Sequence, residues 1–476
     1  MKITRLCLAS LFLLIPIAAF SQDIPLFTSD FPPEEFSARR AKIYEVIGQT
    51  SIALLQGAPA PSGYVRFRQN NEFYYLCGIE VPHAYLLLDG AQRRASLYLP
   101  HRNEARERGE GKLLSAEDAV EIRKLSGIDA VYGIDLLAEH LTRAAGGRIK
   151  TVYTPFMPPE GFATSRDLAL RSIADISSDP WDGRQSREAA FMALIRSRFP
   201  QFEIRDLSPA LDQSRLIKSP RELALIRKAT ELSCEAILES MKATKPGMME
   251  YELDGLAKYI FYRRGAQGEA YYSLIAGGPN AWYPHYNAGK RKMQDGDFLL
   301  MDFAPDFGYY MSDVTRMWPV NGKFSSWQKE LYEFYLGCYQ AILKAIRPGV
   351  TAGVIMQEAA GEMDRILASS RFSKPHYQTA ARAFVDSYRE SAKSGNSLGH
   401  WVGMSTHDVG RDPGPLRAGM VFTIEPQFRI PEEKIYIRLE DLIMITEKGA
   451  EIVSISLPMT VADIEKTMRG EKLAAR

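Results

Sequence analysis

The sequence predicts a two-domain α/β protein, and its length and its order of elements support this. The chain has 476 residues, of which 46% are hydrophobic and 25% charged, and this exceeds the comfortable size of one domain. Helical and β-type segments alternate in the first half, as in a mixed α/β domain. The second half begins with long helices and ends with strands, which is compatible with helices that back a curved antiparallel sheet.

The expected elements follow from hydrophobic periodicity and from the turn residues between segments. In the first half, helices are expected at 35–46, 116–125 and 187–197, and strands at 51–55, 84–88 and 95–99. In the second half, helices are expected at 220–241, 250–264, 327–346 and 354–368, with strands after the last of them. The charged segment after Val461 is expected to be a solvated helix.

The first 21 residues have the pattern of a signal peptide. Lys2 and Arg5 precede an apolar stretch, 6–20, and small residues lie before an expected cleavage site after Ser21. The stretch is short for a membrane span, so we expect an exported protein, periplasmic or secreted, without stable membrane insertion after cleavage. An uncleaved amino-terminal anchor is the alternative.

Charge and cysteine content argue against two further classes. Loss of the predicted signal peptide changes the net charge from +1 to −1, because two cations and no acids are removed. This favours neither nucleic acid nor an anionic membrane as a partner. Cys77, Cys234 and Cys338 remain, an odd number without close spacing, so a disulfide framework is not expected.

Two carboxylates lie on a predicted hairpin between residues 299 and 316. If Phe307 and Gly308 form its tip, Asp302 pairs with Asp313 across the ladder. Directly opposed residues have Cβ atoms about 4.5–5.5 Å apart, where like charges destabilise a sheet. We therefore expect something positive between the two carboxylates.

A second pair of carboxylates, Glu425 and Glu440, follows the same reasoning. Their runs are joined through residues 431–434, and their odd separation allows a simple hairpin to oppose them. One such clash can be an exposed, salt-screened accident. Two clashes among apolar neighbours, where an unpaired charge is very costly, instead indicate a shared metal cluster.

A histidine is the fifth expected ligand. His400 and His407 lie seven residues apart in a glycine-containing segment, which lets backbone approach an ion or substrate closely; a structural role is the alternative. Four carboxylates and one imidazole make a mostly oxygen site, which suits manganese, cobalt, iron or zinc in a catalytic centre. The sequence thus predicts a metallohydrolase.

The order of Asp302, Asp313, His400, Glu425 and Glu440 resembles that of the aminopeptidase P, prolidase and methionyl aminopeptidase superfamily, the pita-bread metallopeptidases. Segments that resemble its signature blocks are 301–303, 312–316, 399–403, 406–410, 424–426 and 437–441. Residues 64–78 resemble the hallmark of the aminopeptidase P amino-terminal domain, and residues 218–229 resemble the start of the catalytic domain.

The resemblance implies a specific domain arrangement. After a signal peptide at 1–21, a creatinase-like α/β domain is expected at 22–215. An α+β pita-bread catalytic domain with a curved antiparallel sheet is expected at 216–465, and a charged tail at 466–476.

The resemblance also implies two divalent metal ions, with manganese expected and cobalt, zinc or iron as alternatives. Asp302 would bind one ion, His400 and Glu425 the other, and Asp313 and Glu440 would bridge them, with a hydroxide between the ions. Such a pair lowers the pKa of water and polarises the scissile carbonyl. Glu425 is also expected to pass a proton to the leaving nitrogen.

Four further residues have expected roles around the metals. His285 and His407 fall where the family places histidines near the substrate carbonyl; for His285 an ordinary loop histidine is the alternative. Trp282 is expected to line a substrate pocket, although most aromatic clusters are core. Arg438 precedes Glu440 by two residues, on the same strand face, and is expected to orient a carboxylate ligand or to bind substrate.

The expected activity is that of an Xaa-Pro aminopeptidase, which acts on peptides with proline in second place. Prolidase, a non-catalytic peptide-binding homologue and a metal-independent creatinase-like hydrolase are the alternatives, and the resemblance is compatible with a homodimer. Asn396, Gln427 and Arg429 depart from the family pattern, in which histidine, glycine and tyrosine are usual at these positions. These departures leave the proline-recognising pocket and the preferred peptide length open.

Overall fold

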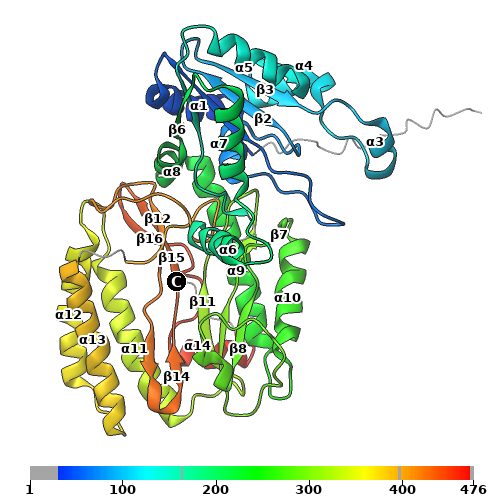
Figure 1. Cartoon of the computed structure of the whole chain (residues 1–476). Coiled ribbons are helices and arrows are strands. Elements are labelled where there is room, and N and C mark those ends of the chain that lie inside the picture. The colour runs from blue at the N-terminus through cyan, green and yellow to red at the C-terminus, as the bar shows by residue number, and fades with distance from the viewer. Residues whose placement is uncertain (1–29, 162–163, 395–397, 472–476) are drawn as a thin grey trace, which may run out of the picture.

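The structure, a computed structural model, describes residues 30–161, 164–394 and 398–471. The predicted signal peptide and Asn396 therefore lie outside the described residues. Figure 1 shows an amino-terminal domain above a larger carboxy-terminal domain. Within the described segments, no helix is long and apolar enough to cross a membrane.

The amino-terminal domain is built on a six-stranded mixed sheet with the strand order β4-β3-β2-β1-β5-β6. Its strands are β1 (Ser51–Gln56), β2 (Tyr85–Asp89), β3 (Arg94–Leu99), β4 (Ala130–Gly133), β5 (Thr151–Thr154) and β6 (Glu203–Asp206). Strands β1, β2 and β3 pair antiparallel, whereas β3–β4, β1–β5 and β5–β6 pair parallel. The predicted strand pair is confirmed, with Leu88 opposite Ala95.

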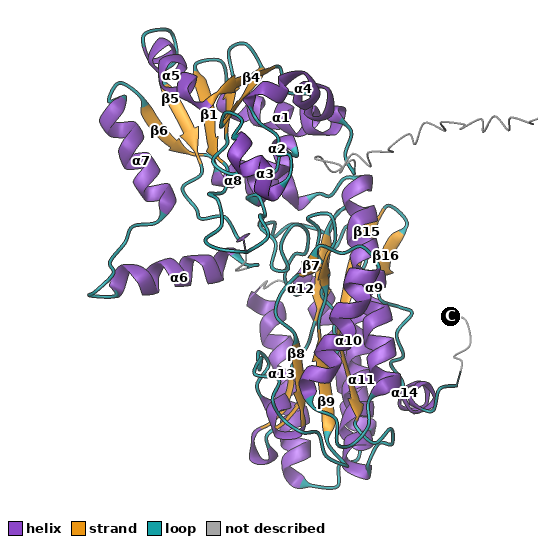
Figure 2. Cartoon of the chain, turned by 90° about the vertical axis from the view of Figure 1, so that its right-hand side faces the viewer, coloured by secondary structure: helices purple, strands orange, loops and turns teal. Residues whose placement is uncertain are grey.

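Helices cover both faces of this sheet. They are α1 (Pro33–Ile47), α2 (Asn71–Cys77), α3 (Glu104–Glu110), α4 (Ala119–Ser126), α5 (Leu137–Ala145), α6 (Arg166–Ser178), α7 (Arg187–Arg198) and α8 (Ser208–Leu216). Apolar residues of α1 and α4 pack on one face and those of α5 and α7 on the other, and Figure 2 shows the sheet between α1 and α7. Helix α6 projects near the junction with the second domain.

The carboxy-terminal domain places strands between two groups of helices (Figure 1). Its helices are α9 (Pro220–Ala243), α10 (Glu250–Arg263), α11 (Ser326–Ala345), α12 (Ala352–Ser369), α13 (Pro375–Ser394) and α14 (Val461–Met468). The first of these begins where the sequence predicts, because Pro220 occupies the first turn and Ser219 and Glu222 form a reciprocal capping box. This arrangement agrees with the α+β catalytic domain that the family resemblance implies.

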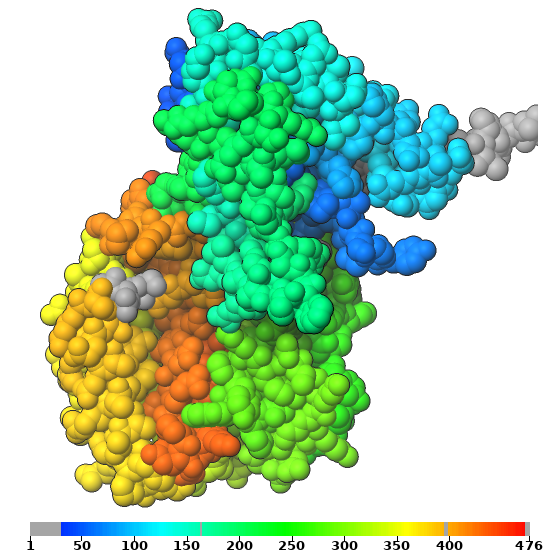
Figure 3. Space-filling model, in the orientation of Figure 1, coloured from blue at the N-terminus to red at the C-terminus, as the bar shows by residue number. Residues whose placement is uncertain are grey.

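The strands of this domain form several short antiparallel ladders. They are β7 (Gly268–Glu269), β8 (Leu274–Gly277), β9 (Phe298–Asp302), β10 (Pro305–Asp306), β11 (Thr315–Pro319), β12 (Val421–Ile424), β13 (Phe428–Ile430), β14 (Ile435–Ile437), β15 (Asp441–Thr446) and β16 (Gly449–Ile452). The sheets β11-β9-β8 and β12-β15-β16 meet at a bridge between Thr315 and Glu440. In Figure 3 the orange-red carboxy-terminal strands are visible between the yellow helical side and the green side of the domain.

The predicted pairing of Asp302 with Asp313 is wrong. Asp302 lies opposite Thr315, two residues further along the chain, and Asp313 precedes β11. The tip is Gly308 and Tyr309, both with positive φ, rather than Phe307 and Gly308. The turn therefore lies one residue later than predicted, and each one-residue shift of a hairpin tip changes the opposing partner by two.

The second predicted pair has the expected register. Phe428 lies opposite Ile437 in the β13–β14 ladder, and Ile424 lies opposite Asp441 in the β12–β15 ladder. Both ladders, when extended, place Glu425 opposite Glu440 in the gap between them. The solvated helix expected after Val461 exists as α14, but Ile464 is fully buried, so the helix packs one face against the domain.

Candidate metal centre

The candidate site forms where strand ends from two sheets converge. Asp302 ends β9, Asp313 precedes β11, Glu425 follows β12 and Glu440 precedes β15. Thr315 and Glu440 exchange backbone hydrogen bonds of 3.3 and 3.0 Å, which join the two sheets at this point. Because the carboxylates come from adjoining strand ends, a rigid backbone fixes their spacing.

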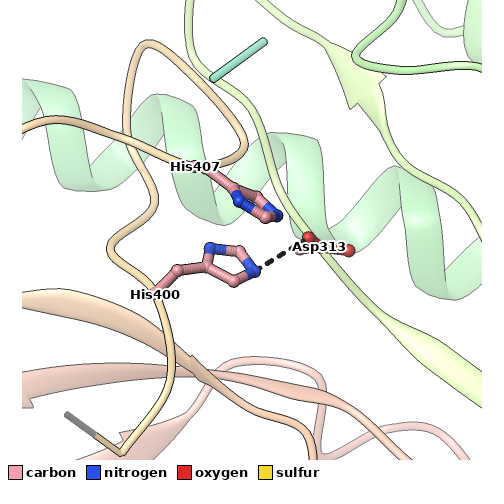
Figure 4. Close-up of side chains that lie close together, drawn as sticks. All are labelled: Asp313, His400 and His407. Carbon is pink, nitrogen blue, oxygen red and sulfur yellow. Dashed lines mark ion pairs between the residues drawn. The ribbon is translucent and has the colours of Figure 1, made fainter. Parts of the chain in front are cut away.

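The structure brings the five predicted ligands together. Potential ligand atoms of Asp302, Asp313 and Glu440 lie within 4.8 Å of one another, and so do those of His400, Glu425 and Glu440. The two groups share Glu440. His400 Nε2 lies 3.4 Å from Asp313 Oδ2, 3.4 Å from Glu425 Oε1 and 3.8 Å from Glu440 Oε1, and Figure 4 shows it directed at Asp313.

The electrostatics of the cluster match a cation site. Burial, followed by repulsion from Asp302 and Glu425, raises the pKa of Asp313 well above its ordinary value. Burial and the neighbouring carboxylates likewise raise the pKa of Glu440. Glu440 Oε1 is buried and has no hydrogen-bond partner among the described residues. A shared divalent cation would compensate both features, so the residues present fit a metal centre.

Two neighbouring side chains hold the carboxylates in place. Arg438, whose side chain is 3% exposed, donates to Glu425 Oε2 at 3.1 Å and also to Asp302 Oδ2. Of the two roles predicted for Arg438, the structure shows contact with carboxylate ligands. The Tyr271 hydroxyl lies 2.5 Å from Asp302 Oδ1 and 2.6 Å from Asp313 Oδ1, so its single hydrogen can be donated to either carboxylate.

The contact made by Tyr271 was not predicted from the sequence. Thr315 was also missed, and it donates to Glu440 Oε2 at 2.7 Å. No local signal marks either residue, because both contacts join residues that are far apart in the sequence. They supply the hydrogen bonds that orient ligand carboxylates in metal sites.

The two further predicted histidines, His407 and His285, come from different loops near the carboxylate cluster. The ring of His407 stacks on that of His400 with centroids 3.9 Å apart, as Figure 4 shows. Desolvation of its stacked ring, followed by the neighbouring His400, His285 and Arg438 side chains, lowers the pKa of His407 to about 3, although part of the residue is exposed. His285 is exposed in the loop after the 3-10 helix Gly278–Trp282.

A buried carboxylate organises the loop that carries His285 and Trp282. Glu250, at the start of α10, is fully buried and accepts four hydrogen bonds. The donors are the backbone N–H groups of Gly277 and Arg291, the Asn280 amide and the Tyr286 hydroxyl, at 2.8 to 3.0 Å. This set fixes both ends of the loop, whereas Trp282 itself is half-buried and its substrate role stays a prediction.

The loop that carries His407 is held from the amino-terminal domain. His407 N–H donates to Thr164 O at 3.1 Å, and Asn71 Nδ2 donates to Met404 O at 3.1 Å and to Ser405 Oγ at 3.0 Å. Asp408 is paired with Arg215 and with Lys218. We name the surrounding ion pairs the interdomain charge cluster, formed by Glu72, Glu160, Arg166, Asp212, Arg215, Lys218 and Asp408.

Comparison with known proteins assigns the fold and the site to one family. The model of metallopeptidase family M24 matches residues 224–447, and that of the aminopeptidase P N-terminal domain matches residues 36–153. A Xaa-Pro aminopeptidase from Escherichia coli is 30% identical over 460 residues, which cover 92% of this chain and 98% of that relative. The chain belongs to metallopeptidase family M24. It is a metallo-aminopeptidase of the Xaa-Pro aminopeptidase type, with the aminopeptidase P domain order.

Solved structures and a further relative agree with this assignment. A putative aminopeptidase P from Bacillus anthracis has a TM-score of 0.77 at 27% identity, covering 93% of this chain and 100% of its own. Aminopeptidase P from E. coli with the inhibitor Pro-Leu has a TM-score of 0.72 at 27% identity, covering 92% and 99%. The human Xaa-Pro dipeptidase is 27% identical over 474 residues, covering 88% of this chain and 89% of that protein.

Proposed function

We propose that this M24 enzyme hydrolyses the bond between a free amino-terminal residue and a following proline, using two divalent metal ions. The observation that carries the proposal is the convergence of Asp302, Asp313, His400, Glu425 and Glu440 on one buried point. Manganese is the proposed metal, with cobalt, zinc or iron as alternatives, because the donor set is mostly oxygen. When bound, the ions supply Lewis acidity and an activated water.

The protein's own groups divide the remaining work. The Glu425 side chain is 21% exposed, whereas those of Asp302, Asp313 and Glu440 are 5%, 7% and 1% exposed. Glu425 is therefore the carboxylate that substrate reaches most easily, which suits transfer of a proton to the leaving nitrogen. His407, with its pKa lowered to about 3, is neutral near pH 7 and keeps one N–H to donate to a substrate oxygen.

Prolidase activity is the second candidate, because the similarity to the human Xaa-Pro dipeptidase extends over 88% of this chain. A non-catalytic peptide-binding role is disfavoured, since all five predicted ligands are present and adjacent. A metal-independent creatinase-like hydrolase is disfavoured as well, because its chemistry gives no reason for this carboxylate set.

The test measures proline release from Arg-Pro-Pro and from Ala-Pro by chelated protein, before and after manganese is added. Restored cleavage supports the proposal, and the preferred peptide chooses between aminopeptidase and prolidase. Asp313→Ala is expected to remain inactive, whereas Glu447→Gln, at an exposed turn, is the matched control and is expected to retain activity. No metal binding by the wild type would refute the proposal.

We further propose that the chain is exported and cleaved after Ser21, from the signal-peptide pattern of residues 1–21. The mature protein in the periplasm or medium should then begin at Gln22, as mass spectrometry would show. Retention of the intact amino terminus inside the cell would refute this. A homodimer is a separate proposal, tested by light scattering.

A further inference from the structure

One face of the β13–β14 ribbon continues outward from the metal centre. Side chains alternate along a strand, so Glu425, Gln427 and Arg429 share one face. The ladder places Arg429 opposite Tyr436, and by the same alternation Tyr436 shares its face with Arg438. This face therefore carries Glu425 and Arg438 at one end and Arg429 at the other, about 13 Å from Glu425 along the strand.

Arg429 lies against two aromatic rings at this outer end. Its Cζ atom is 4.5 Å from the ring centroid of Tyr436 and 5.3 Å from that of Trp282. Trp282 ends the 3-10 helix that precedes His285, so Arg429 bridges the ligand-bearing ribbon and the loop of the predicted substrate histidine. Both Arg429 and Trp282 are half-buried.

The guanidinium of Arg429 has no carboxylate partner among the described residues. Within the described residues, its polar contact is a 3.1 Å hydrogen bond from Nη2 to Oε1 of the exposed Gln427. Arg438, two residues beyond Tyr436, instead pairs with two carboxylates. A second polar group is unsatisfied nearby, since Tyr436 is 2% exposed and its hydroxyl has no hydrogen-bond partner in the described part of the chain.

This environment suits a carboxylate ligand. A guanidinium presents several N–H donors in a planar fork that matches the two carboxylate oxygens. The flanking rings hold the cation by cation–π attraction and keep it partly out of water, which strengthens its attraction for an anion. An aromatic residue at position 429 would offer neither the charge nor the fork.

We propose that Arg429, supported by Trp282 and Tyr436, forms a subsite for a carboxylate of the substrate. This inference rests on the proposed peptidase function and specifies the substrate class. The carboxylate belongs either to the side chain of an acidic amino-terminal residue or to the terminus of a short Xaa-Pro peptide. Both sources present the same chemical group, so the experiment must separate them.

The test compares kcat/KM of the manganese-loaded enzyme on two matched peptide pairs. Glu-Pro-Ala-amide against Gln-Pro-Ala-amide isolates the side-chain carboxylate, and Ala-Pro against Ala-Pro-amide isolates the terminal one. The wild type should prefer the charged member of one pair about ten- to a hundred-fold, as expected for a charge-assisted hydrogen bond. Preference in the first pair assigns the side chain, and preference in the second assigns the terminus.

Substitution of Arg429 decides whether this residue is responsible. Arg429→Gln should reduce the preference to within about twofold of unity, mainly by raising KM for the charged peptide, and Arg429→Lys should retain part of it. Arg365→Gln, on the exposed surface of α12, should leave the preference intact. Equal losses on all four peptides, or no preference in the wild type, would overturn the inference while leaving the peptidase function standing.

A different result would bear on the proposed function instead. If the wild type cleaves none of the four peptides, that function fails for them, and calorimetric titration of the same pairs into the wild type and Arg429→Gln replaces the kinetic comparison. Tighter binding of one charged member, lost in Arg429→Gln, would still support the subsite. Equal affinities within each pair would overturn it.

Discussion

Two buried charge clusters lie close together in this protein and differ in how their acids are compensated. In the interdomain charge cluster, Arg166, Arg215 and Lys218 face four carboxylates, and each carboxylate pairs with at least one of these cations. In the metal centre, four carboxylates face Arg438 as their only arginine among the described residues. In the first cluster the cations balance all but one of the carboxylates, whereas the second has the larger charge deficit of a cation-binding site.

The pKa values follow this difference. In the interdomain cluster, Arg215 and Arg166 outweigh the cost of burial and lower the pKa of Glu160 to about 2. Glu72, the carboxylate in excess of the cations, takes the opposite shift to about 7 because of burial and repulsion from Glu160. In the metal centre, the pKa values of Asp313 and Glu440 are both raised. Similar burial therefore produces opposite results, according to the cations that the fold supplies.

The largest expected effect is on activity at the metal centre. Glu440→Gln should lower kcat/KM about a thousand-fold or more, because metal-based stabilisation of the transition state is worth several kcal/mol. Without metal, the same variant should be at least as stable as the wild type, since one of the repelling carboxylates is gone. Thermal unfolding of both proteins in chelator checks this. A lower melting temperature for the variant than for the wild type would contradict the charge deficit.

The next effect concerns stability at the interdomain cluster. Arg215→Met should cost about 3–5 kcal/mol, because it leaves Asp408 and Glu160 buried without their main partner. Urea unfolding measures this loss of unfolding free energy. The loss should be the same in manganese-loaded protein and in protein treated with chelator. Arg205→Met removes an exposed arginine paired with Glu203 and is the control. A loss below about 1 kcal/mol is the range of a surface ion pair. Such a value would contradict the interpretation of this cluster as a set of buried, mutually compensated charges.

The clusters should also respond differently to pH. Asp313 and Glu440 have folded pKa values above their ordinary values of 3.8 and 4.5, so the unfolded chain releases their protons first and metal-free stability falls as pH rises above about 4. Glu160 has a lowered pKa, so its contribution is present above 4.5 and is lost as pH falls towards about 2. Glu72 should contribute equally to the pH dependence of stability in the metal-free and the manganese-loaded protein. The difference between the metal-free and manganese-loaded melting curves therefore isolates the metal centre, and it should grow with pH.

The smallest expected effect concerns a residue that orients the ligands. Tyr271→Phe removes hydroxyl contacts to Asp302 and Asp313 and should weaken manganese affinity about ten- to a hundred-fold. Calorimetric titration of manganese into the metal-free protein measures this. Tyr272→Phe, at an exposed neighbouring position, is the control. An unchanged affinity would show that backbone geometry alone aligns the carboxylates.

The hairpin register shows where sequence reasoning reached its limit. The alternation of residues identified Asp302 and Asp313 correctly as neighbours of one site, but not their pairing. The turn at Gly308 and Tyr309 requires positive φ at a tyrosine, which is unfavourable locally. Contacts from the other domain stabilise it: the Tyr309 ring stacks on Tyr74 at 3.6 Å, and its hydroxyl donates to Glu80 at 2.7 Å. No window of the sequence around the turn contains those partners.

The amino-acid sequence was sufficient to predict the fold class, most of the helices and the set of acids and histidine that gather at one point. These follow from periodicity, from capping residues such as Ser219 and from the cost of burying like charges. Three features are visible only in the folded protein, namely the Thr315–Glu440 bridge, the compensation of Asp408 by Arg215 and the placement of Arg429 between two rings. Each of these depends on residues distant in sequence, whose contacts form only when the strands and the two domains pack together.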